Sequence, residues 1–255
     1  MSPNFSHSKI GCYEGCPRKF KFKYVDHIKL PKEPEGIEAF VGKRAHETLQ
    51  QLYAEQLKGK VLSLDEMLAV YKQLWDKEYS DAVQIVKKEK TVQEYYESGA
   101  NQLTGYYERF KPFNHTYTLG LEMEIKFDLD DKGVYKMKGF VDRFSYKGKG
   151  TYEIHDYKTG MKAYTQEEAD EDRQLALYQI YVEQEYPEAK EVVLIWHFLA
   201  DNKDVKSRRT KKQINELRTE LLKSIHKIEA DDNYKPNVSY LCDWCEYKDI
   251  CPAKK

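Results

Sequence analysis

Apolar residues recur along this chain with two different periods, and the change from one period to the other marks the expected elements. Where they return every three or four residues they predict a helix, and where they alternate with polar residues they predict a half-buried strand. An almost unbroken apolar run predicts a fully buried strand. These patterns predict helices over residues 39–57, most of 62–110, 169–185 and 207–231, and strands over residues 119–130, 134–146, 151–158 and 191–200. The strand–helix–strand order of residues 151–200 predicts a crossover within a mixed sheet.

Two of these strands are predicted to form a hairpin that carries three charged side chains. The first strand is rich in aromatic and β-branched residues, and a turn of glycine and lysine separates it from the second. Asp142 lies on the first strand, and Asp156 and Lys158 lie on the second. Because side chains alternate faces along a strand, Asp156 and Lys158 point the same way. If the strands pair, Asp142 approaches Asp156 across the ladder.

Two carboxylates that lie this close repel each other unless a cation lies between them. Oxygen ligands of this kind suit Mg²⁺ or Mn²⁺. Lys158 would add a positive charge beside water activated by the metal, an arrangement suited to attack on a phosphodiester. The alternative is a hairpin whose surface carries an ordinary Asp–Lys pair, because charges at strand ends are mostly solvated.

Composition adds few constraints to this picture. With 255 residues the chain can bury a full core, and its formal net charge of -1 leaves any basic groove local. Basic and aromatic residues interleave over residues 18–24, which is compatible with a phosphate backbone and stacked bases. No apolar run is long enough to span a membrane, and the first residues carry no apolar signal core. We therefore expect a cytoplasmic protein.

The cysteines indicate a second metal site. Cys242, Cys245 and Cys251 follow a C-x2-C-x5-C pattern and need a fourth ligand to close a tetrahedral or cluster site. Cys16, which precedes a proline, is the candidate, and Cys12 is the alternative. An iron–sulfur cluster, a zinc ion and unliganded thiols all remain open, although a Cys-x3-Cys pair is a poor second zinc knuckle.

Six motifs in order give the chain a resemblance to a known family. They are CPRKF at residues 16–20, G-x-x-x-H at 42–46, GFVDR at 139–143, DYKT at 156–159, Q-L-x-x-Y at 174–178, and the cysteine triplet with its trailing Pro252. In this order they resemble the PD-(D/E)XK nucleases of the RecB type, in the branch with C-terminal iron–sulfur cysteines. That branch includes the nuclease domain of AddB and the CRISPR-associated adaptation exonucleases. The chain departs from the family's name because Val141 stands where the proline would be.

The resemblance implies roles for the residues of the catalytic motifs. The implied ligands of Mg²⁺ or Mn²⁺ are His46, Asp142, Asp156 and the backbone carbonyl of Tyr157. Lys158 would position and activate the water. The resemblance further implies that Gln174 and Tyr178 orient the DNA strand beside the scissile phosphate, and that Glu124 is an accessory acid.

The resemblance also implies the fold and the second cofactor. We expect an α/β fold of the restriction-endonuclease type, with a mixed central sheet flanked by helices. The expected organisation is one nuclease domain over residues 1–255, with a helical lobe over 39–112, a catalytic sheet over 119–200 and a cysteine-rich tail over 232–255. The tail would pair with Cys16 to hold a 4Fe–4S cluster and join the chain's two ends, with zinc as the alternative. The implied cluster ligands are Cys16, Cys242, Cys245 and Cys251.

The expected function is metal-dependent hydrolysis of DNA, by an exonuclease acting on single-stranded or frayed ends in repair, recombination or phage DNA processing. No P-loop motif is present, so the chain does not supply a helicase motor of its own. A motor would then come from a helicase partner, and an integrase partner is the other expectation. Assembly into a homo-oligomer is a separate expectation. The alternatives are a nuclease that trims prespacers in CRISPR adaptation and a DNA-end-binding module without catalysis.

Overall fold

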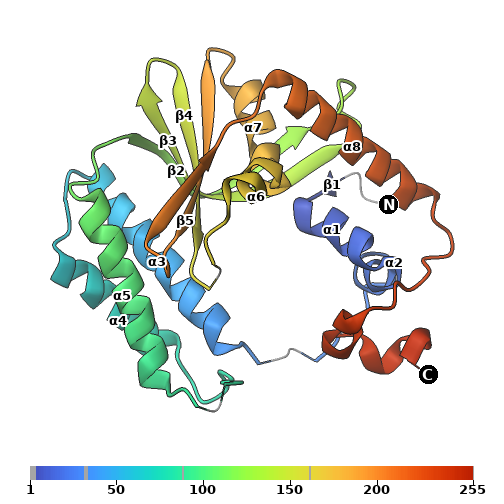
Figure 1. The fold of residues 1–255 in the computed structure, drawn as a ribbon, viewed down its shortest axis with the longest axis horizontal. Coiled ribbons are helices and arrows are strands. Elements are labelled where there is room, and N and C mark those ends of the chain that lie inside the picture. Colours follow the sequence, from blue (N-terminus) through green and yellow to red (C-terminus); the bar gives the residue numbers. More distant parts are fainter. Residues whose placement is uncertain (1–3, 32–33, 88, 161, 255) are drawn as a thin grey trace. The chain divides into compact units, whose positions relative to one another are not determined.

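The computed structural model describes residues 4–31, 34–87, 89–160 and 162–254, and the chain divides into two compact units. The larger unit comprises residues 33–125 and 140–209, and the smaller comprises residues 1–32, 126–139 and 210–255. Figure 1 shows the elements of both. The prediction of one domain over the whole chain stays a prediction.

A mixed sheet forms the centre of the larger unit. In this sheet β3 (Lys136–Gly148) pairs antiparallel with β4 (Thr151–Lys158), and β4 pairs parallel with β5 (Glu191–Phe198). The edge strand β6 (Lys203–Ser207) is antiparallel to β5, and β2 (Tyr117–Asp128) pairs with β3. The expected α/β architecture, a mixed sheet flanked by helices, is confirmed.

Three helices of this unit share one apolar core. They are α3 (Ile37–Leu57), α4 (Leu64–Glu78) and α5 (Val92–Phe110), which lie side by side in Figure 1. Their buried residues form one cluster that also includes Tyr157 of β4. Most of residues 62–110 were expected to be helical, and the structure has two helices there, which begin at capping boxes at Ser63 and Thr91.

Two further helices follow β4. They are α6 (Gln166–Glu171) and α7 (Arg173–Glu185), and α7 packs on β4 and β5. Asp172 separates them because its carboxylate caps α7 by accepting from the backbone N–H of Gln174 at 2.9 Å. The expected single helix over residues 169–185 therefore begins earlier and is interrupted.

The pairing of β3 with β4 decides which side chains share a face. Arg143 lies opposite His155, so these two residues point to one face of the sheet. Asp142 and Asp156, one step along each strand, point to the other face. This alternation separates two sets of polar residues that are neighbours in sequence.

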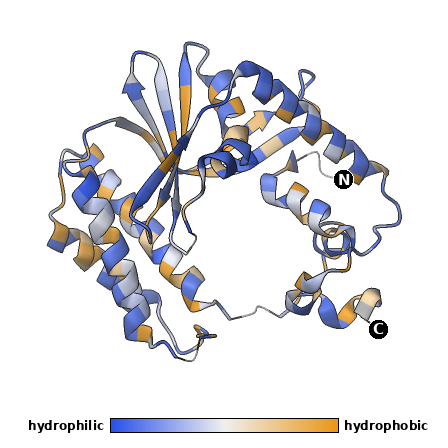
Figure 2. Ribbon diagram, in the orientation of Figure 1, coloured by the Kyte–Doolittle hydropathy of each residue, from blue (hydrophilic) through white to orange (hydrophobic). Residues whose placement is uncertain are grey.

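The smaller unit gathers segments from both ends of the chain. There β1 (Asn4–Phe5) pairs in parallel with the start of β3, and α1 (His7–Gly15) packs on α8 (Lys211–Ala230). The apolar side of α8 is buried, and Figure 2 shows its polar and apolar positions. The expected helix over residues 207–231 begins later, because Thr210 caps it and the preceding residues form β6.

The remaining short helices are α2 (Pro17–Phe20), the π-helix η1 (Lys21–Val25), and the 3-10 turns η2 (Tyr240–Trp244), η3 (Lys248–Ile250) and η4 (Pro252–Lys254).

Within the described part of the chain, no helix combines the length and the apolar character that a membrane crossing requires.

Candidate active site

Three potential metal ligands from three elements of the larger unit lie close together. They are His46 of α3, Glu122 of β2 and Asp142 of β3, and their ligand atoms all lie within 4.8 Å of one another. The Nδ1 atom of His46 is 3.5 Å from Asp142 Oδ2 and 3.7 Å from Glu122 Oε1. One imidazole nitrogen and two carboxylates in this space form a donor set suited to a divalent cation.

The orientation of the His46 ring fits a cation at this position. Its Nε2 atom lies 2.8 Å from the carbonyl oxygen of Tyr157. A carbonyl only accepts, so Nε2 carries a proton and donates it, which leaves Nδ1 facing the two acids. That nitrogen needs either a proton or a metal ion between itself and the carboxylates. Burial alone would lower the pKa of His46, but the nearby carboxylates of Glu122 and Asp142 outweigh it and raise the pKa to about 9.

Asp142 is held in an environment that disfavours its negative charge. Its Oδ2 atom accepts a hydrogen bond of 2.7 Å from the backbone N–H of Tyr157. Burial and the charge of Asp156 raise the pKa of Asp142 to about 7, although His46 opposes this rise. Burial likewise raises the pKa of Asp156, which is 6 % exposed. A cation bound beside these two acids would stabilise their ionised forms.

Lys158 supplies one positive charge beside this pair. Its Nζ atom lies 2.7 Å from Asp156 Oδ2, and the side chain is 20 % exposed. Burial would lower the pKa of Lys158, but the carboxylate of Asp156 outweighs it and raises the pKa. The side chain is therefore an ammonium ion held in a fixed position, with a part of its surface open to water.

Helix α7 brings two of the predicted residues to the same face of the sheet. Gln174 and Tyr178 are one turn apart, and the hydroxyl of Tyr178 hydrogen-bonds with the Gln174 side chain and with the backbone of Phe140. Burial raises the pKa of Tyr178, and the charges of Asp156 and Asp142 add to this rise. The tyrosine is therefore a neutral hydroxyl close to both acids.

A close approach between α3 and the end of β4 sets the position of His46. A Cβ atom on Gly42 would lie only 2.8 Å from Thr159 Oγ1, so the helix sits nearer to the strand than a larger residue would allow. Four residues later, one helical turn on, His46 reaches Tyr157 and Asp142. A cavity of about 500 Å³ opens beside this face of α3 and is lined by Gly42, His46 and Glu122.

The structure adds one acid to those predicted. Glu122 lies in the group with His46 and Asp142, whereas the accessory role predicted for Glu124, an exposed residue of the same strand, stays a prediction. Glu122 adopts a φ of 45°, in the left-handed region, so the simple alternation of β2 fails at this residue. No pattern of apolar and polar residues could have indicated it.

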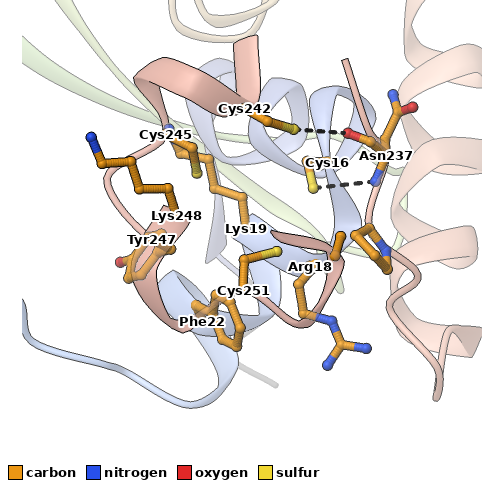
Figure 3. A pocket seen from close by; sticks show the side chains of 12 residues that line it. Cys16, Arg18, Lys19, Phe22, Asn237, Cys242, Cys245, Tyr247, Lys248 and Cys251 are labelled. Atoms are coloured by element: carbon orange, nitrogen blue, oxygen red, sulfur yellow. Dashed lines mark hydrogen bonds between the residues drawn. The ribbon is translucent and has the colours of Figure 1, made fainter. Parts of the chain in front are cut away.

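All five cysteines lie in the smaller unit, and four of them line one cavity (Figure 3). Cys16, at the junction of α1 and α2, faces the cavity together with Cys242, Cys245 and Cys251 of the tail. Cys12 does not line it. The backbone N–H of Asn237 lies 3.4 Å from the sulfur of Cys16, and the N–H of Ser239 lies 3.4 Å from that of Cys242.

Comparison with known proteins adds a family and a fold. Residues 4–252 match the family model described as the PD-(D/E)XK nuclease superfamily, and no curated protein matches the chain. The crystal structure of a protein named "Putative exonuclease" from Eubacterium rectale is similar over 97 % of this chain and 88 % of that chain, with 13 % identity and a TM-score of 0.53. The structure of SSO0001 is similar over 94 % of this chain and 95 % of that chain, with 14 % identity and a TM-score of 0.36. The first likeness shows the fold alone.

Proposed function

The chain belongs to the PD-(D/E)XK nuclease superfamily, and from that membership we propose that it is a deoxyribonuclease that uses Mg²⁺ or Mn²⁺ to hydrolyse DNA from single-stranded or frayed ends. The observation that carries this proposal is the convergence of His46, Glu122 and Asp142 beside Asp156 and Lys158. Three acids, an imidazole and an ammonium from four different elements have no evident structural purpose at one place.

The donor set fits a divalent ion. Asp142, Asp156, His46 and Glu122 would hold it, and the Tyr157 carbonyl, whose oxygen keeps a second lone pair beside its bond to His46, is a further candidate. When bound, such an ion lowers the pKa of water and offsets the negative charge that develops on the phosphate. Burial raises the pKa of Asp142 and of Asp156, so a bound cation would stabilise both carboxylates in their ionised form.

The chain's own side chains would orient the reactants. Asp156 holds the ammonium of Lys158, which can donate a hydrogen bond to the attacking water and to a phosphate oxygen. Gln174 fixes the hydroxyl of Tyr178, and together they present polar groups to the DNA backbone on the α7 side. Preorganised donors of this kind stabilise charge that appears only in the transition state.

One observation supports action at ends. The structurally similar protein from Eubacterium rectale carries the name of an exonuclease. The expected helicase or integrase partner and homo-oligomer stay predictions.

The test is a nuclease assay on end-labelled linear and closed circular DNA with Mg²⁺, Mn²⁺ or EDTA. We expect linear DNA to be lost in either metal and to persist in EDTA, with circular DNA intact. Lys158→Ala should lose at least about a hundredfold in rate, while Lys203→Ala, which removes an exposed lysine of the same unit, should match wild type. Equal rates for Lys158→Ala and wild type would refute the proposed site.

We further propose that the four cavity cysteines hold a 4Fe–4S cluster that joins the start of the chain to its tail. Support comes from the cavity that Cys16 lines together with Cys242, Cys245 and Cys251 of the tail. Four thiols from the two ends of the chain can complete one cluster. Protein purified without air should be brown and contain iron; colourless protein with one zinc per chain would contradict this.

A further inference from the structure

A second polar cavity lies on the face of the sheet opposite to Asp142 and Asp156. It has a volume of about 290 Å³ and is enclosed by side chains of α3, α5 and the strands β3 to β6. Arg143 and His155, which alternate with the two acids along their strands, face it. The cavity is therefore separate from the candidate metal centre, although the same two strands serve both.

Arg143 lies deep in this cavity without an anionic partner. The residue is 3 % exposed, and its guanidinium donates to the hydroxyl of Tyr157 at 3.3 Å, to Thr116 Oγ1 at 3.2 Å and to His155 Nδ1 at 3.0 Å. It also lies 4.2 Å from the centre of the Tyr53 ring. No carboxylate of the described residues pairs with it. A buried cation whose partners are all neutral is costly, which indicates that an anion normally approaches it.

A second arginine at the cavity has unused donors. Arg109 pairs through Nη1 with Asp204 Oδ1 at 2.9 Å. Its Nε and Nη2 atoms are buried and make no hydrogen bond within the described part of the chain. Buried polar atoms are almost always paired, so two orphan donors on one side chain indicate a missing acceptor.

The charges around the cavity leave an excess of two positive units. Arg109 is balanced by Asp204, and Lys147 is balanced by Glu153 at 3.2 Å. Arg143 and Lys206, an exposed residue at the rim, keep no carboxylate partner among the described residues. Two uncompensated cations match the charge of a phosphate monoester, which is about −1.5 to −2 near pH 7.

We propose that this cavity binds a phosphate group, either as free phosphate or as the 5′-phosphate of a mononucleotide. Guanidinium groups present planar forks of donors that fit phosphate oxygens. The aromatic rings of Tyr53, Phe110 and Phe113 also line the cavity, so a flat base has a surface to rest on. The site goes beyond the proposed DNA-cutting function and does not depend on it.

Titration calorimetry on the full-length protein in EDTA tests the proposal, because EDTA removes any contribution from the metal centre. The titrants are inorganic phosphate, deoxyadenosine 5′-monophosphate and deoxyadenosine. We expect the two phosphate compounds to bind and deoxyadenosine to bind at least tenfold more weakly. Nucleotide binding tighter than phosphate binding identifies a nucleotide site, and equal affinities identify a phosphate site.

Variants place the binding in this cavity. Arg109→Gln and Lys206→Gln should each weaken phosphate binding about tenfold or more, the size of one lost charge-assisted hydrogen bond. Arg208→Gln, which removes an exposed arginine paired with Glu191 outside the cavity, should bind as wild type does. Because Arg143→Met could fail to fold, the conclusion rests on the two milder variants. The proposal is overturned if wild type binds neither phosphate compound, if deoxyadenosine binds equally well, or if Arg109→Gln and Lys206→Gln bind like wild type.

Discussion

Replacing Glu122 with glutamine removes one negative charge from the candidate metal site while keeping the shape of the side chain. Glu122 Oε1 lies 3.7 Å from the ring nitrogen of His46, and the side chain is 35 % exposed. Two unit charges about 4 Å apart interact by about 1 kcal/mol in water and about 4 kcal/mol at an effective dielectric constant of 20, and a divalent ion doubles either value. For a side chain one-third exposed we take the value in water, about 2 kcal/mol, which weakens metal binding about 30-fold.

The assay is calorimetric titration of Mn²⁺ into DNA-free protein, and the strand offers a matched control. Glu124→Gln makes the same chemical change two residues away, at an exposed position outside the group of His46, Glu122 and Asp142. We expect this control to bind Mn²⁺ within about twofold of wild type. Circular dichroism should show both variants folded. Equal Mn²⁺ affinity of Glu122→Gln and wild type, or a larger loss in Glu124→Gln, would refute the assignment of Glu122.

Three other predictions concern packing, the cysteines and acid stability. Gly42→Ala should lower the free energy of unfolding in urea by about 1–3 kcal/mol, because the new methyl group meets Thr159 Oγ1; a double variant with Thr159→Ala that recovers nothing would argue against that contact. Cys245→Ser should lose iron and melt at a lower temperature, while Cys12→Ser, whose thiol lies outside the cavity, should keep both; iron retained in Cys245→Ser would contradict the cluster. Burial opposes ionisation of Asp204, but its histidine and arginine partners hold its pKa below the usual value. Its stabilisation is then complete above about pH 4 and is lost as the pH falls through the folded pKa, so the stability gap to Asp204→Asn should close in acid, and a constant gap would be the contrary result.

The hairpin was predictable because its signals are local. Strand β4 has the expected bounds, Thr151–Lys158, since a turn of glycine and lysine precedes it. The positions of Asp142 and Asp156 follow from that pairing alone. In contrast, β6 was not predicted as a strand. An edge strand of five residues needs few apolar side chains, and the sequence of β6 is mostly polar.

Features that depend on the backbone conformation of one residue, or on contacts between residues distant in sequence, could not be predicted. Glu122 enters its group through a left-handed backbone conformation, which no alternation pattern encodes. The buried contact between His155 Nδ1 and His197 Nε2, 2.9 Å apart, was not predicted. The sequence of β5 is an almost unbroken apolar run, which predicts a buried strand but not a partner for its one histidine. In the sequence, Arg143 is only the last residue of the GFVDR motif. Its unpaired guanidinium is visible only when the opposite face of the sheet is described.

The alternation of Asp142 and Arg143 along β3 makes the spacing of this strand as important as its chemistry. Inserting or deleting one residue just before Asp142 would turn the guanidinium toward the face of the proposed cation site and the carboxylate toward the face of the proposed phosphate cavity. A single change would then disrupt both. Substitutions at exposed positions of β3 leave this order intact. Divergent relatives should therefore tolerate many exchanges along the strand but keep its length, and insertions should accumulate in the turns at its ends.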